Sequence, residues 1–408
     1  MEQEGIIYIG EFDFRNENVQ AHLVKNNGTL LRQLGYKVYY VGTNRNCSSF
    51  DEIDKLKKIP MFDDRYLELP HTLTTGGLFK IREVEKKVLS YLNDIKDRQH
   101  VSFVITYQAP TYACILRKIS KWCKDNQVAY IVNCADIPVF DSQTFLRKVV
   151  MKLNWASMHN TNRKRADGII AVSRYIGDFY RRNDRPSVVI PPLFDDSELL
   201  NTNIKTNAVP TFIYAGTPFI ISGHPVKTKG MKDRLDVIME LMIGLELSNI
   251  KFCFQVVGIT FEEYITCVPR QIEALRKSKC IVFYGRRPHT ETLAMLQNAD
   301  YMINYRDNNI MTKAGMSTKV VESVSVGTPV IMNDIGDTFL YLEEKISGIR
   351  LKGHISSDVD TLIGLCTLPI EKRMELKRRC LEKKPFCIDK YVNRLKEFLV
   401  DVDEHRSM

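Results

Sequence analysis

Residues 313–323 contain the residue types that bind phosphate groups. A turn of small residues, Gly315-Met316-Ser317-Thr318, opens an expected helix. Such a turn offers backbone N–H groups and the positive end of the helix dipole to an anion. Lys319 adds charge, and Glu322, one turn into the helix, can accept hydrogen bonds from two adjacent hydroxyls. We therefore expect a ligand with a diphosphate here. The alternative is a plain helix start with Glu322 on a solvated face.

A second group of candidates follows another expected strand. Gly216-Thr217-Pro218 forms a turn at the end of that strand, and Lys227 and Lys229 come after it. Glycine lets a ligand approach the backbone, and a lysine can deliver charge to a departing diphosphate. We predict that Gly216, Thr217 and Lys229 contact the same ligand, the alternative being a basic surface loop.

Two arginines extend this set. Arg286 follows the expected strand 280–283, and Arg306 follows the expected strand 301–304. A guanidinium can stack on a nucleotide base or form paired hydrogen bonds with phosphate. We predict that both arginines contact the ligand, although solvated surface positions would suit them equally well.

Polar residues also follow three expected strands in the first half of the chain. Glu11, Phe12 and Asn18 lie in the loop after the first strand, Tyr107 ends a later one, and Asp136 follows the next. A carboxylate at the end of a strand can orient or deprotonate a hydroxyl, so we predict a catalytic role for Asp136. The alternatives are a turn residue for Asp136 and a helix N-cap for Asn18.

These positions require a framework of parallel sheets. Short apolar segments alternate with segments of helical periodicity, which is typical of α/β folds. The expected strands are 5–10, 37–41, 101–106, 129–133, 168–172 and 187–190, then 211–214, 251–257, 280–283, 301–304 and 329–332. The expected helices are 18–34, 81–97, 111–125 and 144–165, then 231–245, 261–277, 291–298 and 319–326. The candidates therefore follow the carboxyl ends of strands, where open α/β sheets bind ligands.

A chain of 408 residues is too long for one ordinary core, so we expect two domains. The predicted fold is α/β, with two Rossmann-like, doubly wound parallel-sheet domains facing a cleft. The first domain is expected over residues 1–192, a linker over 193–210 and the second domain over 211–386. Residues 387–408 should form a C-terminal helix that packs back through Tyr391, Leu395 and Leu399.

The motifs resemble those of the family 4 retaining glycosyltransferases of the GT-B fold, and the resemblance covers nearly the whole chain. In that family a Glu, seven residues and a second Glu bracket the donor. Glu322 matches the second Glu, which binds the nucleotide ribose, whereas Ala314 stands at the first. A lysine that contacts the diphosphate in the family matches Lys229, and the loop with Glu11 is similar to the acceptor-facing loop.

The resemblance implies transfer of a sugar, with retention, from a UDP- or GDP-linked donor to a saccharide or lipid-linked saccharide in surface-polysaccharide or glycoconjugate synthesis. Asp136 and Lys229 are the catalytic candidates. The other donor-binding candidates are Gly216, Thr217, Arg286, Arg306, residues 315–319 and Glu322; the acceptor-binding candidates are Glu11, Phe12, Asn18 and Tyr107. Fixed positive groups can stabilise a leaving diphosphate, so we expect neither a metal nor a cofactor. Because Ala314 departs from the family pattern, the alternative is an inactive binding or scaffold protein with the same fold.

Composition restricts the location and the partners. No apolar run approaches the roughly 18–20 residues of a membrane span, and the N-terminus lacks a basic, then apolar, secretion signal. We therefore expect a cytoplasmic protein, with association at the inner face of the membrane as a further option. The net charge of +9 favours acidic partners. Ten scattered cysteines without zinc-ligand spacing are expected to be free thiols.

Residues 144–165 combine basic and apolar side chains. Phe145, Val149 and Leu153 alternate with Lys148 and Lys152, and further basic residues follow. The pattern predicts an amphipathic helix on the sheet with solvated lysines. A sharper interpretation is a face that meets an anionic membrane with a lipid-linked acceptor.

Three other classes of protein fit poorly. A dinucleotide-dependent dehydrogenase needs G-x-G-x-x-G after its first strand, but Gly10 is followed by Glu11. A sugar-nucleotide epimerase uses paired carboxylates and histidines around its donor; only His224 and His289 lie near the expected loops of the second half, and no such carboxylate set is visible. The basic charge has no nucleic-acid recognition motif with it, so we expect no nucleic-acid partner.

Overall fold

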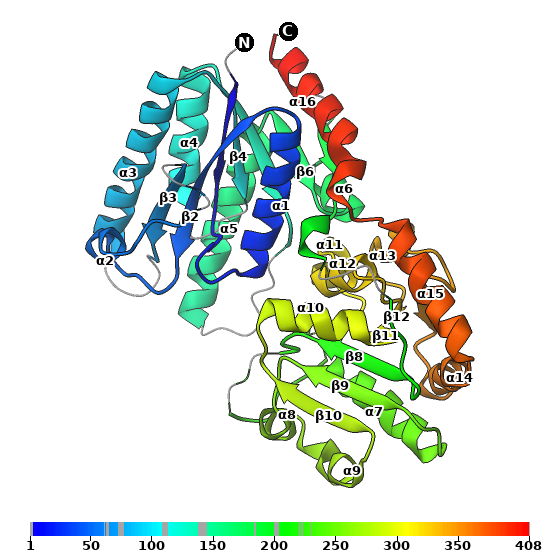
Figure 1. Cartoon of the computed structure of the whole chain (residues 1–408). Helices are drawn as coiled ribbons and strands as arrows, with labels where there is room; N and C mark the ends of the chain where they lie inside the picture. The colour runs from blue at the N-terminus through cyan, green and yellow to red at the C-terminus, as the bar shows by residue number, and fades with distance from the viewer. Residues whose placement is uncertain are drawn as a thin grey trace. The chain divides into compact units, whose positions relative to one another are not determined.

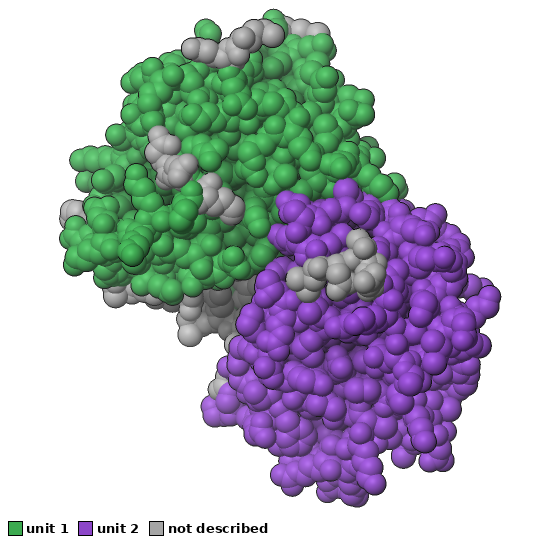
Figure 2. Space-filling view, in the orientation of Figure 1, with its two compact units in different colours: residues 1–193, 388–408 green, residues 194–387 purple. Residues whose placement is uncertain are grey.

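The structure is a computed structural model with two compact units. It describes residues 3–60, 62, 65–71, 77–107, 113–137, 145–182, 185–199, 204–219, 221, 223–229 and 231–407. The first unit comprises residues 1–193 and 388–408, and the second comprises residues 194–387 (Figure 2). Each unit contains one parallel sheet with helices on its faces (Figure 1).

The sheet of the first unit has, in its described part, seven parallel strands in the order β3-β2-β1-β4-β5-β6-β7. Every residue of β5 is buried, because helices cover both faces of a parallel sheet. The strands are β1 (Gly5–Ile9), β2 (Lys37–Asn44), β3 (Tyr66–Pro70), β4 (Val101–Tyr107), β5 (Ala129–Cys134), β6 (Gly168–Ala171) and β7 (Ser187–Val189). The helices are α1 (Val19–Gln33), α2 (Phe50–Asp54), α3 (Gly77–Arg98), α4 (Ala113–Asp125), α5 (Phe145–Arg165), α6 (Arg174–Tyr180), η4 (Ile388–Tyr391) and α16 (Val392–Ser407).

The end of the chain returns to the first unit. Tyr391, Leu395 and Leu399 are buried, as the apolar spacing of this segment requires. A Cβ atom on Gly168 of β6 would lie 2.7 Å from side-chain atoms of Phe398 and Val402. Glycine at this position therefore lets α16 pack directly against the sheet.

The sheet of the second unit has, among its described residues, six parallel strands in the order β10-β9-β8-β11-β12-β13. The strands are β8 (Thr211–Ala215), β9 (Cys253–Val257), β10 (Ile281–Gly285), β11 (Tyr301–Ile303), β12 (Val330–Asn333) and β13 (Gly348–Leu351). The helices are η2 (Asp196–Glu198), α7 (Leu235–Leu247), α8 (Phe261–Cys267), η3 (Pro269–Gln271), α9 (Ile272–Lys277), α10 (His289–Asn298), α11 (Ile310–Ala314), α12 (Thr318–Ser325), α13 (Thr338–Tyr341), α14 (Ile355–Cys366) and α15 (Ile370–Lys383).

Side chains of β8 alternate between two cores. Phe212 and Tyr214 pack with α7 on one face, whereas Ile213 and Ala215 pack with α12 on the other. The predicted α/β class with two Rossmann-like parallel-sheet domains is confirmed. Residues 194–199 and 204–210, expected in a linker, lie in the second unit, where Phe194 donates a backbone hydrogen bond to Phe386.

Three segments differ from their predicted helices. The helix expected over 81–97 begins at Gly77, the helix expected over 231–245 begins at Leu235, and the helix expected over 261–277 is interrupted at Pro269. Proline lacks the N–H that would continue the helix, which explains the break at Pro269. Within the described ranges, no helix combines the length and the apolar character that crossing a membrane would need.

Candidate functional site

Three glycines line the carboxyl edge of the second sheet. Gly216 follows β8, Gly258 follows β9 and Gly285 ends β10, with φ angles of +138°, +109° and +67°. Residues other than glycine rarely adopt such φ angles. A Cβ atom on Gly258 would lie 2.5 Å from the carbonyl carbon and oxygen of Gly216. The loops after β8 and β9 therefore pack closely through their backbones, and Gly216 and Gly258 stay partly exposed.

Asp233, just before α7, joins two of the predicted donor-binding residues. Its Oδ2 accepts a hydrogen bond from Lys319 Nζ at 2.6 Å, and its Oδ1 accepts one from Arg306 Nε at 3.0 Å. The side chains of Asp233 and Arg306 are only 3% and 4% exposed. Tyr214 of β8 donates a third hydrogen bond to this carboxylate at 3.1 Å. We call these four residues the Asp233 cluster.

The charges in the Asp233 cluster determine its ionisation. Burial alone would raise the pKa of Asp233, but Lys319 and Arg306 beside it hold that pKa well below its usual range. Burial and the neighbouring carboxylate raise the pKa of Tyr214, so its hydroxyl stays a donor. One negative and two positive groups leave one positive charge in excess. Such a surplus attracts anions.

Gly216 is needed for the position of Lys319. A Cβ atom on Gly216 would lie 2.1 Å from Cε and 2.9 Å from Nζ of that lysine. The Lys319 side chain therefore passes across the backbone of Gly216 to reach Asp233. This contact joins the glycine turn and the helix start that the sequence predicted separately.

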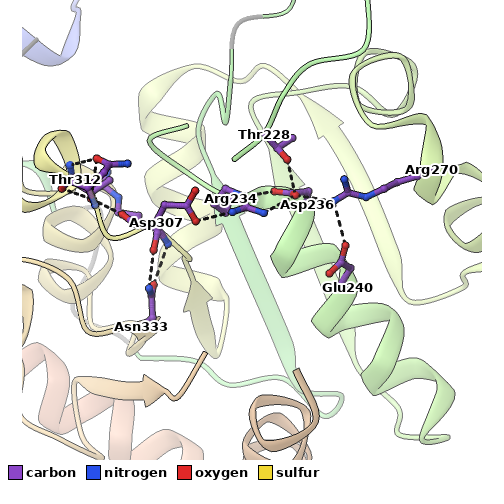
Figure 3. Close-up of polar contacts among 10 residues, drawn as sticks. Thr228, Arg234, Asp236, Glu240, Arg270, Asp307, Thr312 and Asn333 are labelled. Carbon is purple, nitrogen blue, oxygen red and sulfur yellow. Dashed lines mark hydrogen bonds and ion pairs between the residues drawn. The ribbon is translucent and has the colours of Figure 1, made fainter. Parts of the chain in front are cut away.

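A second carboxylate, Asp236, anchors the neighbouring loops (Figure 3). Arg234 donates to Asp236 at 2.9 and 3.0 Å and to Asp307 at 2.6 Å. Thr228 donates its hydroxyl to Asp236 at 2.8 Å, and Arg270 donates at 2.8 Å from the other side. Burial would raise the pKa of Asp236, but the hydrogen bond from Arg234 and those from Thr228 and Arg270 lower it.

Asp236 therefore fixes two segments that carry predicted donor-binding residues. Thr228 is adjacent to Lys229, and Asp307 is adjacent to Arg306. The backbone of Arg306 is also held by Asn333, whose side chain accepts from its N–H at 3.0 Å and donates to its carbonyl at 2.7 Å. Fixed segments of this kind keep a binding site in one geometry.

The predicted phosphate turn precedes α12. Ser317 is the N-cap residue of α12, and its hydroxyl accepts a hydrogen bond from the buried Asn304 amide at 3.5 Å. Met316 is buried in the core beside α12, so its side chain contributes packing. Thr318 begins the helix, where backbone N–H groups point outward.

Glu322 lies on α12 and faces a histidine. Its Oε1 is 3.4 Å from Nε2 of His289, the first residue of α10. The Glu322 side chain is 23% exposed, so it is accessible to a ligand. The predicted ribose-binding residue therefore has a partner to which the sequence assigned no role.

Three other donor-side candidates are exposed to solvent. Arg286 is 59% exposed and pairs with Glu263 at 2.9 Å. Thr217 and Lys229 are exposed. Among the described residues, none of these three contacts Asp233 directly. Their contact with a ligand stays a prediction.

The first sheet brings three acceptor-side candidates to neighbouring strand ends. Glu11 follows β1, Tyr107 ends β4 and Asp136 follows β5, and these strands are adjacent. Burial, followed by the charges of Asp136 and its neighbours, raises the pKa of Tyr107. A Cβ atom on Gly10 would lie 2.6 Å from Cβ of Tyr107, so β1 and β4 approach closely here.

Two acceptor-side candidates have structural roles. Phe12 is fully buried, with its ring centroid 4.9 Å from that of Phe14, so its ring belongs to the core and faces no solvent. Asn18 is the N-cap of α1 and accepts from the N–H of Ala21 at 2.8 Å. Asn18 therefore forms the N-cap that the alternative expected, and its contact with an acceptor stays a prediction.

Asp13, which the sequence did not single out, organises the same loop. Its carboxylate accepts from the N–H groups of Arg15, Asn16 and Arg45 at 3.0 to 3.1 Å. An Asp that accepts a hydrogen bond from the N–H two residues later forms a common type of turn. Only the contact with Arg45 distinguishes Asp13 from an ordinary turn residue.

Comparison with known proteins identifies the fold. No family model matches the sequence, and no curated protein matches it. HepE of Anabaena in complex with UDP and glucose has a TM-score of 0.63 at 11% identity, covering 98% of this chain and 100% of its own. Sucrose-phosphate synthase from Thermosynechococcus elongatus has a TM-score of 0.62 at 13% identity, covering 97% and 98%.

A third similar structure is named as a domain of a phosphatase. The N-terminal domain of trehalose-6-phosphate phosphatase from Candida albicans has a TM-score of 0.63 at 11% identity, covering 99% of this chain and 97% of its own. At such identities these likenesses establish the fold alone. The chain has the two-domain GT-B fold that the sequence predicted.

Proposed function

We propose that the protein is a glycosyltransferase that binds a nucleotide-sugar donor at the carboxyl edge of the second sheet. The Asp233 cluster carries this proposal, because Lys319 and Arg306 share one carboxylate at this edge, where the Lys319 side chain crosses the backbone of Gly216. The surplus positive charge suits a diphosphate. HepE, which has the same fold, was solved with UDP and glucose.

The proposed reaction moves a sugar from a diphosphate to a hydroxyl. The bond between the anomeric carbon and the diphosphate breaks, and the acceptor oxygen bonds to the same face of the sugar that the diphosphate leaves, as retention requires. Lys319, Arg306 and Lys229, with the N–H groups at the start of α12, would stabilise the negative charge on the leaving diphosphate. Asp136 would take the proton of the acceptor hydroxyl. This chemistry uses position and charge, and we propose that it needs no metal and retains the anomeric configuration.

The remaining roles in the proposal follow the geometry of each residue. Glu322 would accept hydrogen bonds from the ribose hydroxyls while His289 holds its carboxylate from α10. Arg286 would contact the base, and the base would be uracil or guanine. The acceptor would be a saccharide or a lipid-linked saccharide of a surface polysaccharide, bound near Glu11 and Tyr107.

A binding protein without activity is the second candidate. Ala314 is fully buried at the position where the resembling family has its first Glu. Burying an unpaired carboxylate is unfavourable, so this position could not simply accept a Glu without rearrangement. Contacts to the sugar ring would have to come from other residues, or the sugar would not react.

Nucleotide binding and turnover can be tested separately. We expect one of UDP, GDP or their sugars to raise the melting temperature of the wild-type chain, because a ligand that binds only the native state stabilises it by mass action. Glu322→Ala should lose this stabilisation. Glu291→Ala is a matched control, since Glu291 is exposed on α10 and pairs with Arg287.

Each result has a defined meaning. Stabilisation by a nucleotide together with release of nucleoside diphosphate from its sugar would support the transferase. Stabilisation without release under any acceptor condition would favour the binding protein. If ADP, UDP, GDP and their sugars all leave the wild-type melting temperature unchanged, the proposed donor site is wrong.

A further inference from the structure

Helix α5 presents apolar side chains to solvent. Phe145 is 83% exposed and Leu153 is 65% exposed, and Val149 and Val150 are also exposed. Residues 145, 149 and 153 are four positions apart, so they share one face of the helix. A helix on a sheet normally turns such a face inward. The N-terminal half of α5 does the reverse.

The neighbouring helix shows the usual arrangement. Helix α4 packs along α5 and buries Ile115, Leu116, Ile119 and Trp122, with its basic residues outward. Helix α5 is instead held to its unit by its C-terminal half. The Asn162 side chain there accepts from the Tyr130 hydroxyl at 3.1 Å, and Met158 is buried. The exposed side chains of Phe145, Val149 and Leu153 therefore lie outside that attachment.

The charge of α5 is strongly one-sided. Residues 145–165 contain six lysines and arginines and no Asp or Glu. Lys152 is exposed on the same face as Phe145 and Leu153, and Arg163 and Lys164 continue that exposed face toward the C-terminal end. The face thus combines large apolar side chains with positive charge along its length.

We infer that this outward face of α5 docks on the surface of an anionic lipid bilayer. Helices that lie in a membrane interface bury Phe and Leu at the boundary between headgroups and acyl chains, while lysines meet lipid phosphates. A second copy of the chain is a poorer partner, because two such faces would bring like charges together. Contact with a bilayer goes beyond the proposed transferase activity and does not depend on it.

Vesicle binding tests this inference without any donor. The full-length chain is sedimented with phosphatidylcholine vesicles that contain or lack phosphatidylglycerol. We expect binding only to the anionic vesicles, weakening as salt is added. Phe145→Ser combined with Leu153→Ser should weaken binding by about tenfold or more, since two large apolar side chains are lost from the interface.

The chain offers matched controls for both substitutions. Leu247→Ser removes an apolar side chain that is 79% exposed in the second unit, and it should leave vesicle binding unchanged. Lys152→Glu should weaken binding and reduce its salt dependence, whereas Lys251→Glu, an exposed position in the second unit, should have a much smaller effect. The nucleotide-induced rise in melting temperature should stay the same in all four variants, which separates this test from that of the proposed function.

Three outcomes would overturn the inference. The wild type could fail to bind anionic vesicles, or the double variant could bind as well as Leu247→Ser does. The third outcome is self-association in the absence of lipid that the double variant abolishes, which would identify the face as an interface between copies. Absence of nucleotide stabilisation in the wild type as well as in every variant would instead contradict the donor site and leave this inference intact.

Discussion

Buried charges hold the carboxyl edge of the second sheet, whereas neutral hydrogen bonds cross the core of the first. In the second unit, Asp233 joins Lys319 and Arg306. In the first unit, the Tyr8 hydroxyl accepts from the Asn27 amide at 3.2 Å and donates to Asn133 at 2.8 Å. Both arrangements tie a helix or loop to central strands, but the Asp233 cluster adds a positive charge to its edge, whereas the hydrogen bonds of Tyr8 add none.

The difference indicates that the polar groups of the two sheets have different roles. Burying ions is unfavourable unless they are paired, so a buried ion cluster is weak evidence for stability and stronger evidence for a binding role. A neutral chain of hydrogen bonds fixes strands without attracting charged ligands. We therefore expect an anion at the second edge and a neutral acceptor near Asp136 at the first.

Asp233→Ala should have the largest effect on this comparison. It leaves Arg306 buried without its carboxylate, and breaking a buried pair in this way costs about 3–5 kcal/mol. The free energy of unfolding of the second unit, measured by hydrogen exchange, should fall by that amount, and nucleotide stabilisation should be lost. Asp178→Ala is the control, because Asp178 forms an ion pair with Arg181 but is 62% exposed. Its effect should stay below about 1 kcal/mol. Equal effects of the two substitutions would contradict the role of Asp233.

Gly216→Ala should have an intermediate effect. The substituted residue is strained at a φ of +138°, and its Cβ would collide with the Lys319 side chain. Gly35→Ala in the first unit is a matched control, with a φ of +93° and open space where the added Cβ atom would lie. Both substitutions should destabilise their units by about 1–3 kcal/mol. Only Gly216→Ala should abolish nucleotide stabilisation in a thermal-shift assay, and retention of that stabilisation would argue against Lys319 as a ligand contact.

The sequence predicted the central strands and the edge strands β7 and β10, but it missed the edge strands β3 and β13. Strands such as β4 and β5 are apolar runs because both of their faces are buried. At the edges of the sheets, β3 contains Glu68 and ends in proline, and β13 has only four residues with Arg350 exposed among them. Edge strands carry polar residues and prolines, so their pattern does not differ from that of a loop.

The candidate site was predictable as separate pieces. Gly216, Arg306 and Lys319 have local signals: a glycine turn, a strand end and a helix start. Asp233 has none, because its partners come from segments that lie far apart in the sequence. An acidic residue before an apolar helix is ordinary, and only the fold reveals what it binds. The sequence also could not reveal that Phe12 is buried, because phenylalanine is common both in cores and in binding loops.

A buried cation caps a helix C-terminus in each unit, and the two cations predict a different dependence of stability on pH. In the first unit the buried Arg185 donates to the carbonyls of Asn162 and Arg163 at the end of α5, at 3.2 and 3.1 Å. In the second unit the buried Lys377 donates to the carbonyls of Gln297 and Ala299 at the end of α10, at 2.7 and 2.5 Å. Burial lowers the pKa of Lys377 to about 8, whereas arginine stays protonated at every pH of interest.

The free energy of unfolding of the second unit should therefore rise with pH. We expect this effect to be smaller than those of Asp233→Ala and Gly216→Ala. Between pH 8 and the ordinary lysine pKa of 10.5, the unfolded chain binds more protons at Lys377 than the folded chain does. Stability then increases as pH rises, by about 1.5 kcal/mol between roughly pH 8 and 9.5. Lys377→Met should remove this slope from unfolding measurements on the second unit, whereas Lys396→Met, at an exposed position on α16, should keep it. If the unfolding free energy of Lys377→Met still rises with pH, another group is responsible for the rise. The lysine at the end of α10 would then not make the second unit more pH-dependent than the arginine at the end of α5 makes the first.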